Sequence, residues 1–187
     1  MSTDSLHAVR TASAAARLPA EARAALDRAL RALDAAQLRH DAAQMSQSLA
    51  DVGRAHRQLA NTEAAEWYMQ QALRWANTLG AADTSIDLLC ELSEMAVAIA
   101  EKGNTDDSGS ARVAHDRARD CAFEAARLAS QCADAQWEIT VLLRVSDTLD
   151  RCGDHDDAIA LQCRALQLIA DENLDPAAAA NRRVRPS

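Results

Sequence analysis

Apolar residues recur every three or four positions along most of this 187-residue chain, the period of a helix that buries one face. Near the end, Leu142 and Leu149 mark one apolar run, a Cys-Gly-Asp turn follows at residues 152–154, and Ala158 and Ala165 mark a second run. This order predicts two antiparallel helices joined by a tight turn. The same pattern predicts helices over residues 4–17, 20–38, 42–60, 62–79, 83–102, 112–131, 134–152 and 155–171. The expected N-caps are Asp41, Asp83 and Asp134.

These helices group into pairs that recur with a period of 40 residues, interrupted by one insertion of 13 residues. Each second helix carries two alanines seven residues apart, on one face, where small side chains let a neighbouring helix approach closely. The alanines are Ala25 and Ala32, Ala65 and Ala72, Ala118 and Ala125, and Ala158 and Ala165. We therefore predict one repeat domain over residues 1–171, with a loop insertion at 103–111, and a flexible tail at 172–187.

The last pair carries Gly153, Asp154 and Ala158, followed by Ala165 and Leu166, and residues 49–73 repeat its layout. In these residues the chain resembles the tetratricopeptide repeat family, in its variety with long helices and units of about 40 residues. The resemblance implies an all-α fold, an α-α superhelix or α-solenoid of about four antiparallel helix pairs. It also implies that the first helices line a concave groove that holds a segment of a partner protein.

Composition supports the helical prediction and narrows the function. Alanine makes up about a quarter of the chain, and aromatic residues only 3%, which disfavours a sheet. A net charge of −8 argues against binding to nucleic acid or to anionic membranes. No stretch is long and apolar enough for a signal peptide or a membrane span. Five cysteines without a C-x-x-C motif indicate a reducing compartment, so we expect a bacterial cytoplasmic protein.

A groove formed by the first helices would be lined by the polar residues between the packed ones. The candidates are Arg10, Arg17, Gln47, Arg54, Arg57, Asp87, Glu94, Asp147 and Asp150. The groove would then be basic in its first half and acidic in its second half. Such a surface suits an extended protein or peptide partner of complementary charge, or a head-to-tail contact between copies. The alternative interpretation is a row of ordinary solvated charges.

Candidate chemistry is sparse. No catalytic or phosphate-binding motif occurs, so we predict neither an enzyme nor a cofactor. Residues 104–109 match the opening of a calcium loop, but His115 occupies the place of the closing Glu. Cys152 with the acidic residues and His155 around it could suggest zinc, but a helix turn with acids at the next N-terminus explains the cluster. We therefore predict no metal.

The sequence predicts a non-enzymatic scaffold or adaptor that binds a peptide or a partner helix. A regulatory sensor for a peptide or small ligand and a self-associating module that forms a homodimer are the alternatives. Trp67 lies on a second helix and would be an interface anchor if exposed. The Arg-rich segment 182–185 is expected to belong to a solvated tail.

Overall fold

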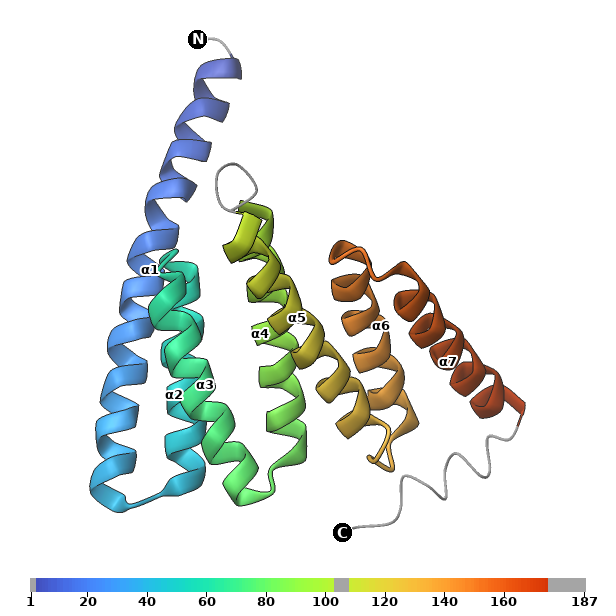
Figure 1. Ribbon diagram of the computed structural model, residues 1–187. Coiled ribbons are helices and arrows are strands. Elements are labelled where there is room, and N and C mark those ends of the chain that lie inside the picture. Colours follow the sequence, from blue (N-terminus) through green and yellow to red (C-terminus); the bar gives the residue numbers. More distant parts are fainter. Residues whose placement is uncertain (1–2, 103–107, 175–187) are drawn as a thin grey trace. The chain divides into compact units, whose positions relative to one another are not determined.

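The computed structural model describes the backbone of residues 3–102 and 108–174, and the side chains of residues 19–102 and 109–171. This part of the chain is all-α (Figure 1), as predicted. Its helices are α1 (Thr3–Arg39), α2 (Ala42–Gln58), α3 (Thr62–Leu79), α4 (Ala82–Lys102), α5 (Ser108–Ala129), α6 (Ala135–Arg151) and α7 (His155–Leu174). They form two compact units, Met1–Gly80 and Ala81–Ser187.

The first unit departs from the prediction at its start. We expected a helix pair with a turn at Leu18 and Pro19, but α1 runs without a break through Pro19. Proline removes one backbone donor, yet the alanine-rich segments on both sides strongly favour helix, and no glycine stops it. The described helices therefore comprise three hairpins and one long helix, and the predicted first pair was wrong.

The long helix α1 also packs through another face than expected. Ala22, Ala29 and Ala36 are buried at seven-residue intervals, whereas the predicted seam alanines Ala25 and Ala32 are half-buried. In the predicted pair, the face with Ala25 and Ala32 would have met a first helix. That partner helix does not exist, since its residues continue α1, and α1 packs on α2 instead.

The α2–α3 hairpin follows the predicted repeat. Ala65 and Ala72 are completely buried. Gly53 of α2 lies so close to α3 that a Cβ atom added to it would stand 2.7 Å from Met69 Cγ and 3.1 Å from the Ala65 carbonyl oxygen. The small residue thus sets the close approach of the two helices.

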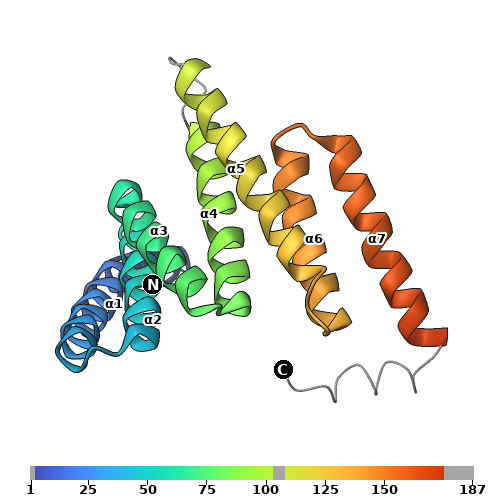
Figure 2. The same cartoon turned by 60° about the horizontal axis from the view of Figure 1, so that its bottom comes forward.

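The second unit consists of two hairpins, α4–α5 and α6–α7. Their seams contain the predicted alanines Ala118, Ala125, Ala158 and Ala165, each at most 2% exposed. Helix α5 packs on α6, and α4 also contacts α6, so the hairpins stack one after the other. Figure 2 shows α6 and α7 running side by side. Stacked hairpins with small-residue seams are the packing expected of a helical repeat.

The helix ends confirm most of the predicted boundaries. Asp41 caps α2 by accepting from the Gln44 N–H at 3.0 Å, and Asp134 caps α6 in the same way. Asp83 was wrongly predicted as a cap, because α4 begins one residue before it. Helix α5 begins at Ser108, so residues 108–111 of the predicted loop are helical. Ala114 at this end is buried, which extends the apolar stripe of α5.

Within the described residues, no helix is long and apolar enough to cross a lipid bilayer. Residues 103–107 of the predicted insertion and 175–187 of the predicted tail lie outside the described residues.

Candidate functional site

The first unit carries an open groove of about 360 Å³ between α1 and α2. It is lined by Ala25, Arg28, Ala29 and Ala32 of α1 and by Asp51, Arg54, Ala55 and Gln58 of α2. Half of this lining is alanine, so the backbones of both helices lie close to the groove surface. The other half can donate or accept hydrogen bonds. The two half-buried alanines of α1 thus line a surface rather than a helix seam.

Three predicted groove residues lie on α2. Arg54 Nη1 donates to Asp51 Oδ1 at 3.0 Å, and the Gln47 amide donates to the same oxygen at 3.2 Å. This arrangement holds Arg54 at the groove. Arg57 is exposed but does not belong to the groove lining, whereas Gln58 does.

Arg10 and Arg17 lie in α1, outside the residues whose side chains the structure describes. Their predicted role stays a prediction. Arg28, which sequence reasoning missed, supplies the second guanidinium of the groove. It was missed because it lies on a predicted second helix, and only first helices were expected to line the surface.

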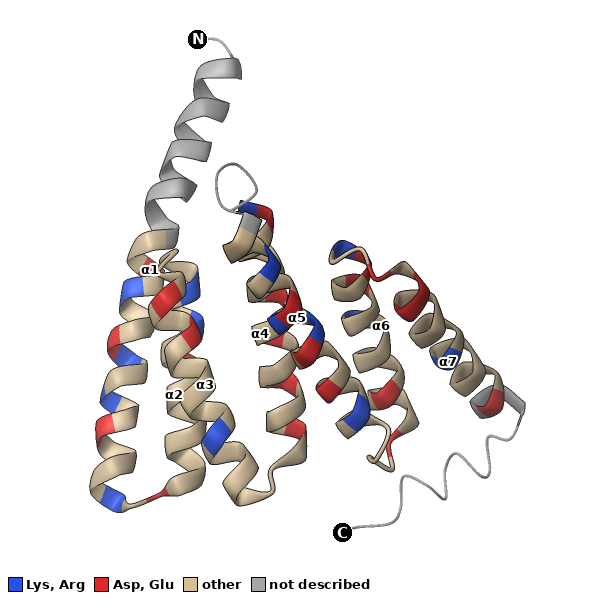
Figure 3. Cartoon of the chain, in the orientation of Figure 1, with Lys and Arg blue, Asp and Glu red and all other residues tan. Residues whose placement is uncertain are grey.

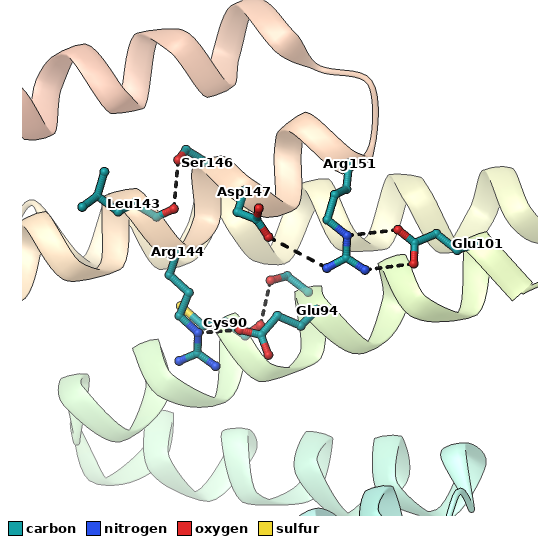
Figure 4. Close-up of polar contacts among 9 residues, drawn as sticks. Cys90, Glu94, Glu101, Leu143, Arg144, Ser146, Asp147 and Arg151 are labelled. Carbon is teal, nitrogen blue, oxygen red and sulfur yellow. Dashed lines mark hydrogen bonds and ion pairs between the residues drawn. The ribbon is translucent and has the colours of Figure 1, made fainter.

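In the second unit, the predicted acidic residues meet arginines of a neighbouring helix (Figure 4). Arg144 Nε of α6 donates to Glu94 Oε1 of α4 at 2.5 Å. One heptad further along both helices, Arg151 donates to both carboxylate oxygens of Glu101, at 3.0 and 2.9 Å. The hydrogen bonds from Arg151 hold the pKa of Glu101 below its ordinary value.

Two further carboxylates flank this α4–α6 seam. Asp87 Oδ1 lies 3.8 Å from Arg144 Nη1, and Asp147 Oδ2 lies 3.9 Å from Arg151 Nη1. Asp87, Glu94 and Asp147 therefore lie in ion pairs within the unit. The seam is net negative, because four carboxylates face two guanidiniums. Its ion pairs connect α4 to α6, so these carboxylates contribute to packing within the unit.

Sequence reasoning missed Arg144, Arg151 and Glu101. Part of the signal was present, because Glu94 and Glu101 of α4 and Arg144 and Arg151 of α6 show the same spacing of seven residues. Equal spacings on two packed helices allow a ladder of ion pairs, but the partners lie fifty residues apart, three fewer than equivalent positions of the repeat.

Cys90 lies beneath the seam and is 1% exposed. Burial raises the pKa of its thiol to about 12, although the Arg144 charge acts in the opposite direction. For Arg144, burial is the largest single effect and lowers the guanidinium pKa, but the hydrogen bond to Glu94 and the nearby charges of Glu94 and Glu91 together outweigh it and raise the pKa. A thiol of this kind is protonated at neutral pH and is a poor nucleophile.

The cluster considered for zinc is held by other contacts. Arg119 of α5 binds both carboxylate oxygens of Asp154, with Nε 2.8 Å from Oδ2. His155 Nδ1 lies 2.6 Å from Asp150 Oδ1, which places the last predicted groove residue at the α6–α7 turn. Across the described ranges, no three His, Cys, Asp or Glu side chains are grouped so that they could hold a metal ion.

The calcium hypothesis falls largely on residues 104–107, which lie outside the described residues. The rest of that motif, Ser108 and Gly109, belongs to the first turn of α5.

The aromatic residues of the α2–α3 hairpin form a small cluster. His56 stacks on Tyr68 with ring centroids 5.4 Å apart, and Trp67 meets Tyr68 edge to face at 4.8 Å. Trp67 is 55% exposed, as the hypothesis of an interface anchor requires. Trp75 and Trp137 are half-buried, which fits a packing role.

Charges of both signs occur along the described part of α1 and along α5 (Figure 3), whereas the charged residues of α4 before Lys102 are all acidic. The local pattern at the groove and at the α4–α6 seam is therefore more informative than the net charge of −8.

No family model and no curated protein matches the chain. Among solved structures, it is similar to one titled "DHF58 filament", with 20% identity, 82% of this chain and 83% of that chain covered, and a TM-score of 0.49. It is also similar to the de novo designed helical repeat protein DHR64, with 18% identity, coverages of 89% and 84%, and a TM-score of 0.43. Likeness at this level carries no function, and the fold assignment rests on the hairpins described above.

Proposed function

We propose that this chain is a non-enzymatic protein-interaction module that holds a helix or an extended peptide of a partner protein in the α1–α2 groove. The groove itself is the observation that carries the proposal. Its four alanines leave room for a partner backbone to approach closely, and its polar residues offer donors and an acceptor in fixed positions.

The charges of the groove favour an acid-bearing partner. Arg28 and Arg54 supply two guanidiniums against the single carboxylate of Asp51, which already accepts from Gln47 and Arg54. A partner carboxylate can therefore gain charge-assisted hydrogen bonds at the groove. Because both walls are helices, the partner bears most of the ordering cost on binding.

The hairpins with paired alanines support assignment to the tetratricopeptide-like repeats, in which groove binding of partner segments is usual. Five free thiols support a reducing compartment, for which we propose the bacterial cytoplasm. The protonated thiol of Cys90 and the ion pairs around it support a structural, non-enzymatic role for that region.

The proposal is tested with a displayed peptide library that contains both acidic and basic members, selected against the full chain. We expect acidic peptides to be enriched. Calorimetry should then show that Arg28→Glu with Arg54→Glu weakens binding at least tenfold. The matched control is Arg31→Glu with Arg39→Glu, which makes the same charge change at exposed α1 residues outside the groove lining. Equal losses in both double variants would refute binding at the groove.

A further inference from the structure

Helix α7 carries an exposed apolar stripe on the side away from its buried residues. Ile159 is 56% exposed and Leu166 is 63% exposed, and Cys163 and Ala170 are exposed between and beyond them. Spacings of four, three and four residues place these side chains on one face of the helix. The buried residues Ala158, Ala165 and Leu168 face the rest of the unit instead.

The internal repeat shows what this face is suited to contact. Forty residues earlier, Arg119 and Ala126 occupy the equivalent positions on α5. Arg119 reaches Asp154 of the following hairpin, and Ala126 is 8% exposed, so this face of α5 lies against the next hairpin. On α7 the same face carries Ile159 and Leu166 in place of Arg119 and Ala126, and Cys163 in place of the larger Phe123. It is therefore built to pack against a helix.

The order of side-chain sizes in the stripe identifies the helix that fits. Large and small residues alternate as Ile159, Cys163, Leu166 and Ala170. When the stripe is paired with a second copy of itself in antiparallel orientation, Ile159 meets Ala170 and Leu166 meets Cys163, so each large side chain faces a small one. A parallel pairing would oppose large to large. Alternation of this kind produces interlocked packing between helices.

We propose that a second copy of this chain packs its α7 against this α7, antiparallel, to form a symmetric dimer. Such a contact is isologous, since the same stripe serves both copies, and it closes at two subunits. A single helix pair is a small interface, so we expect assembly at roughly tens to hundreds of micromolar. The contact uses the second unit only and is independent of the α1–α2 groove.

The test is the molar mass of the full chain, measured by sedimentation over a wide concentration range under reducing conditions. The unaltered chain should shift from monomer to dimer, and Leu166→Glu should stay monomeric. Val113→Glu is the matched control, because Val113 of α5 is 58% exposed and lies outside the stripe; it should dimerise like the unaltered chain. Circular dichroism verifies that each variant is folded. A chain that stays monomeric up to about 1 mM, or a Leu166→Glu variant that dimerises normally, overturns the proposal.

A second experiment tests the register without relying on a disruptive variant. Cys163 residues of two copies would lie about 4.5 Å apart along helices whose axes are separated by about 8–10 Å. A short bismaleimide should therefore link the unaltered chain into a covalent dimer, and Cys163→Ser should abolish this product. Mixing Leu166→Glu with Cys163→Arg should restore a dimer, since the two new charges then face each other. Absence of the Cys163 product at concentrations that give dimer, or a mixture that stays monomeric, would overturn the antiparallel α7 contact.

Discussion

The ion pair between Glu94 and Arg144 should contribute to the stability of the second unit, although the sequence indicated Glu94 as a groove residue and did not indicate Arg144 at all. Glu94 is 25% exposed, Arg144 is 35% exposed, and they share a hydrogen bond of 2.5 Å. Hydrogen bonds to charged groups contribute about 1.5–3 kcal/mol, and partial exposure reduces this through solvent screening. We expect a coupling free energy of about 1 kcal/mol.

A double-mutant cycle with Glu94→Gln and Arg144→Met isolates this coupling, because Gln keeps the shape of Glu and Met keeps most of the apolar stem of Arg while removing its charge. The free energy of unfolding of the four proteins is measured in urea, at low salt and again at high salt. The coupling should fall at high salt, because ions screen the pair. Glu124 and Arg127, an exposed pair within α5, form the control cycle, in which we expect a smaller coupling.

If the Glu94–Arg144 coupling is no larger than that of the control pair, this ion pair does not help to join α4 to α6. Glu94 would then return to the set of residues available for a partner, as the sequence alone suggested.

Three other predictions test the packing, the buried thiol and the turns. Gly53→Ala should destabilise the first unit by about 1–2 kcal/mol in urea unfolding, because the new methyl group meets the fully buried Met69 and the Ala65 carbonyl. Burial raises the pKa of Cys90 from 9.0 to about 12, so the folded state favours the neutral thiol. The contribution of this thiol to the free energy of unfolding should be fully present below pH 9. Above pH 9 the free energy of unfolding should fall by about 1 kcal/mol per pH unit. Cys90→Ala should reduce that slope, measured in the same unfolding assay. Ala60 has a left-handed φ of 58°, and at the equivalent turn of the last hairpin Gly153 has a φ of 87°. Because glycine adopts this conformation without strain, Ala60→Gly should raise the free energy of unfolding by about 0.5 kcal/mol. Gly153→Ala should lower it by about 1 kcal/mol.

The sequence predicted the hairpins well because their signals are local. Alanines seven residues apart mark the seams of α2–α3, α4–α5 and α6–α7, and all six of these alanines are buried. Asp and Asn residues at helix starts mark the boundaries, and Asn61, which was not predicted, caps α3 by accepting from the Ala64 N–H. Period and capping depend on neighbours in the chain, so a single sequence contains them.

The errors arise where the structure depends on contacts between residues far apart in the sequence. We expected Pro19 to lie in a turn between two antiparallel helices. Instead, the residues before and after Pro19 form one continuous helix, α1. The rotation of α1 that buries Ala22 and Ala29 follows from packing on α2, which local periodicity does not contain. The ion pairs of Glu94 and Glu101 depend on the register of α4 against α6, fifty residues away. The candidate groove could be predicted only in part and only on its α2 wall, where Arg54 lies, since its α1 wall depends on the same unforeseen packing.

The most direct test of groove binding uses the full chain with its alanine methyl groups labelled, titrated with an acidic peptide from the library selection. Ala25, Ala29, Ala32 and Ala55 line the groove, whereas Ala65 and Ala72 are buried in the α2–α3 seam of the same unit. We predict that the peptide shifts the methyl resonances of the four groove alanines and leaves the two seam alanines unchanged. Shifts confined to alanines outside the groove would contradict the assignment of this surface as the binding site.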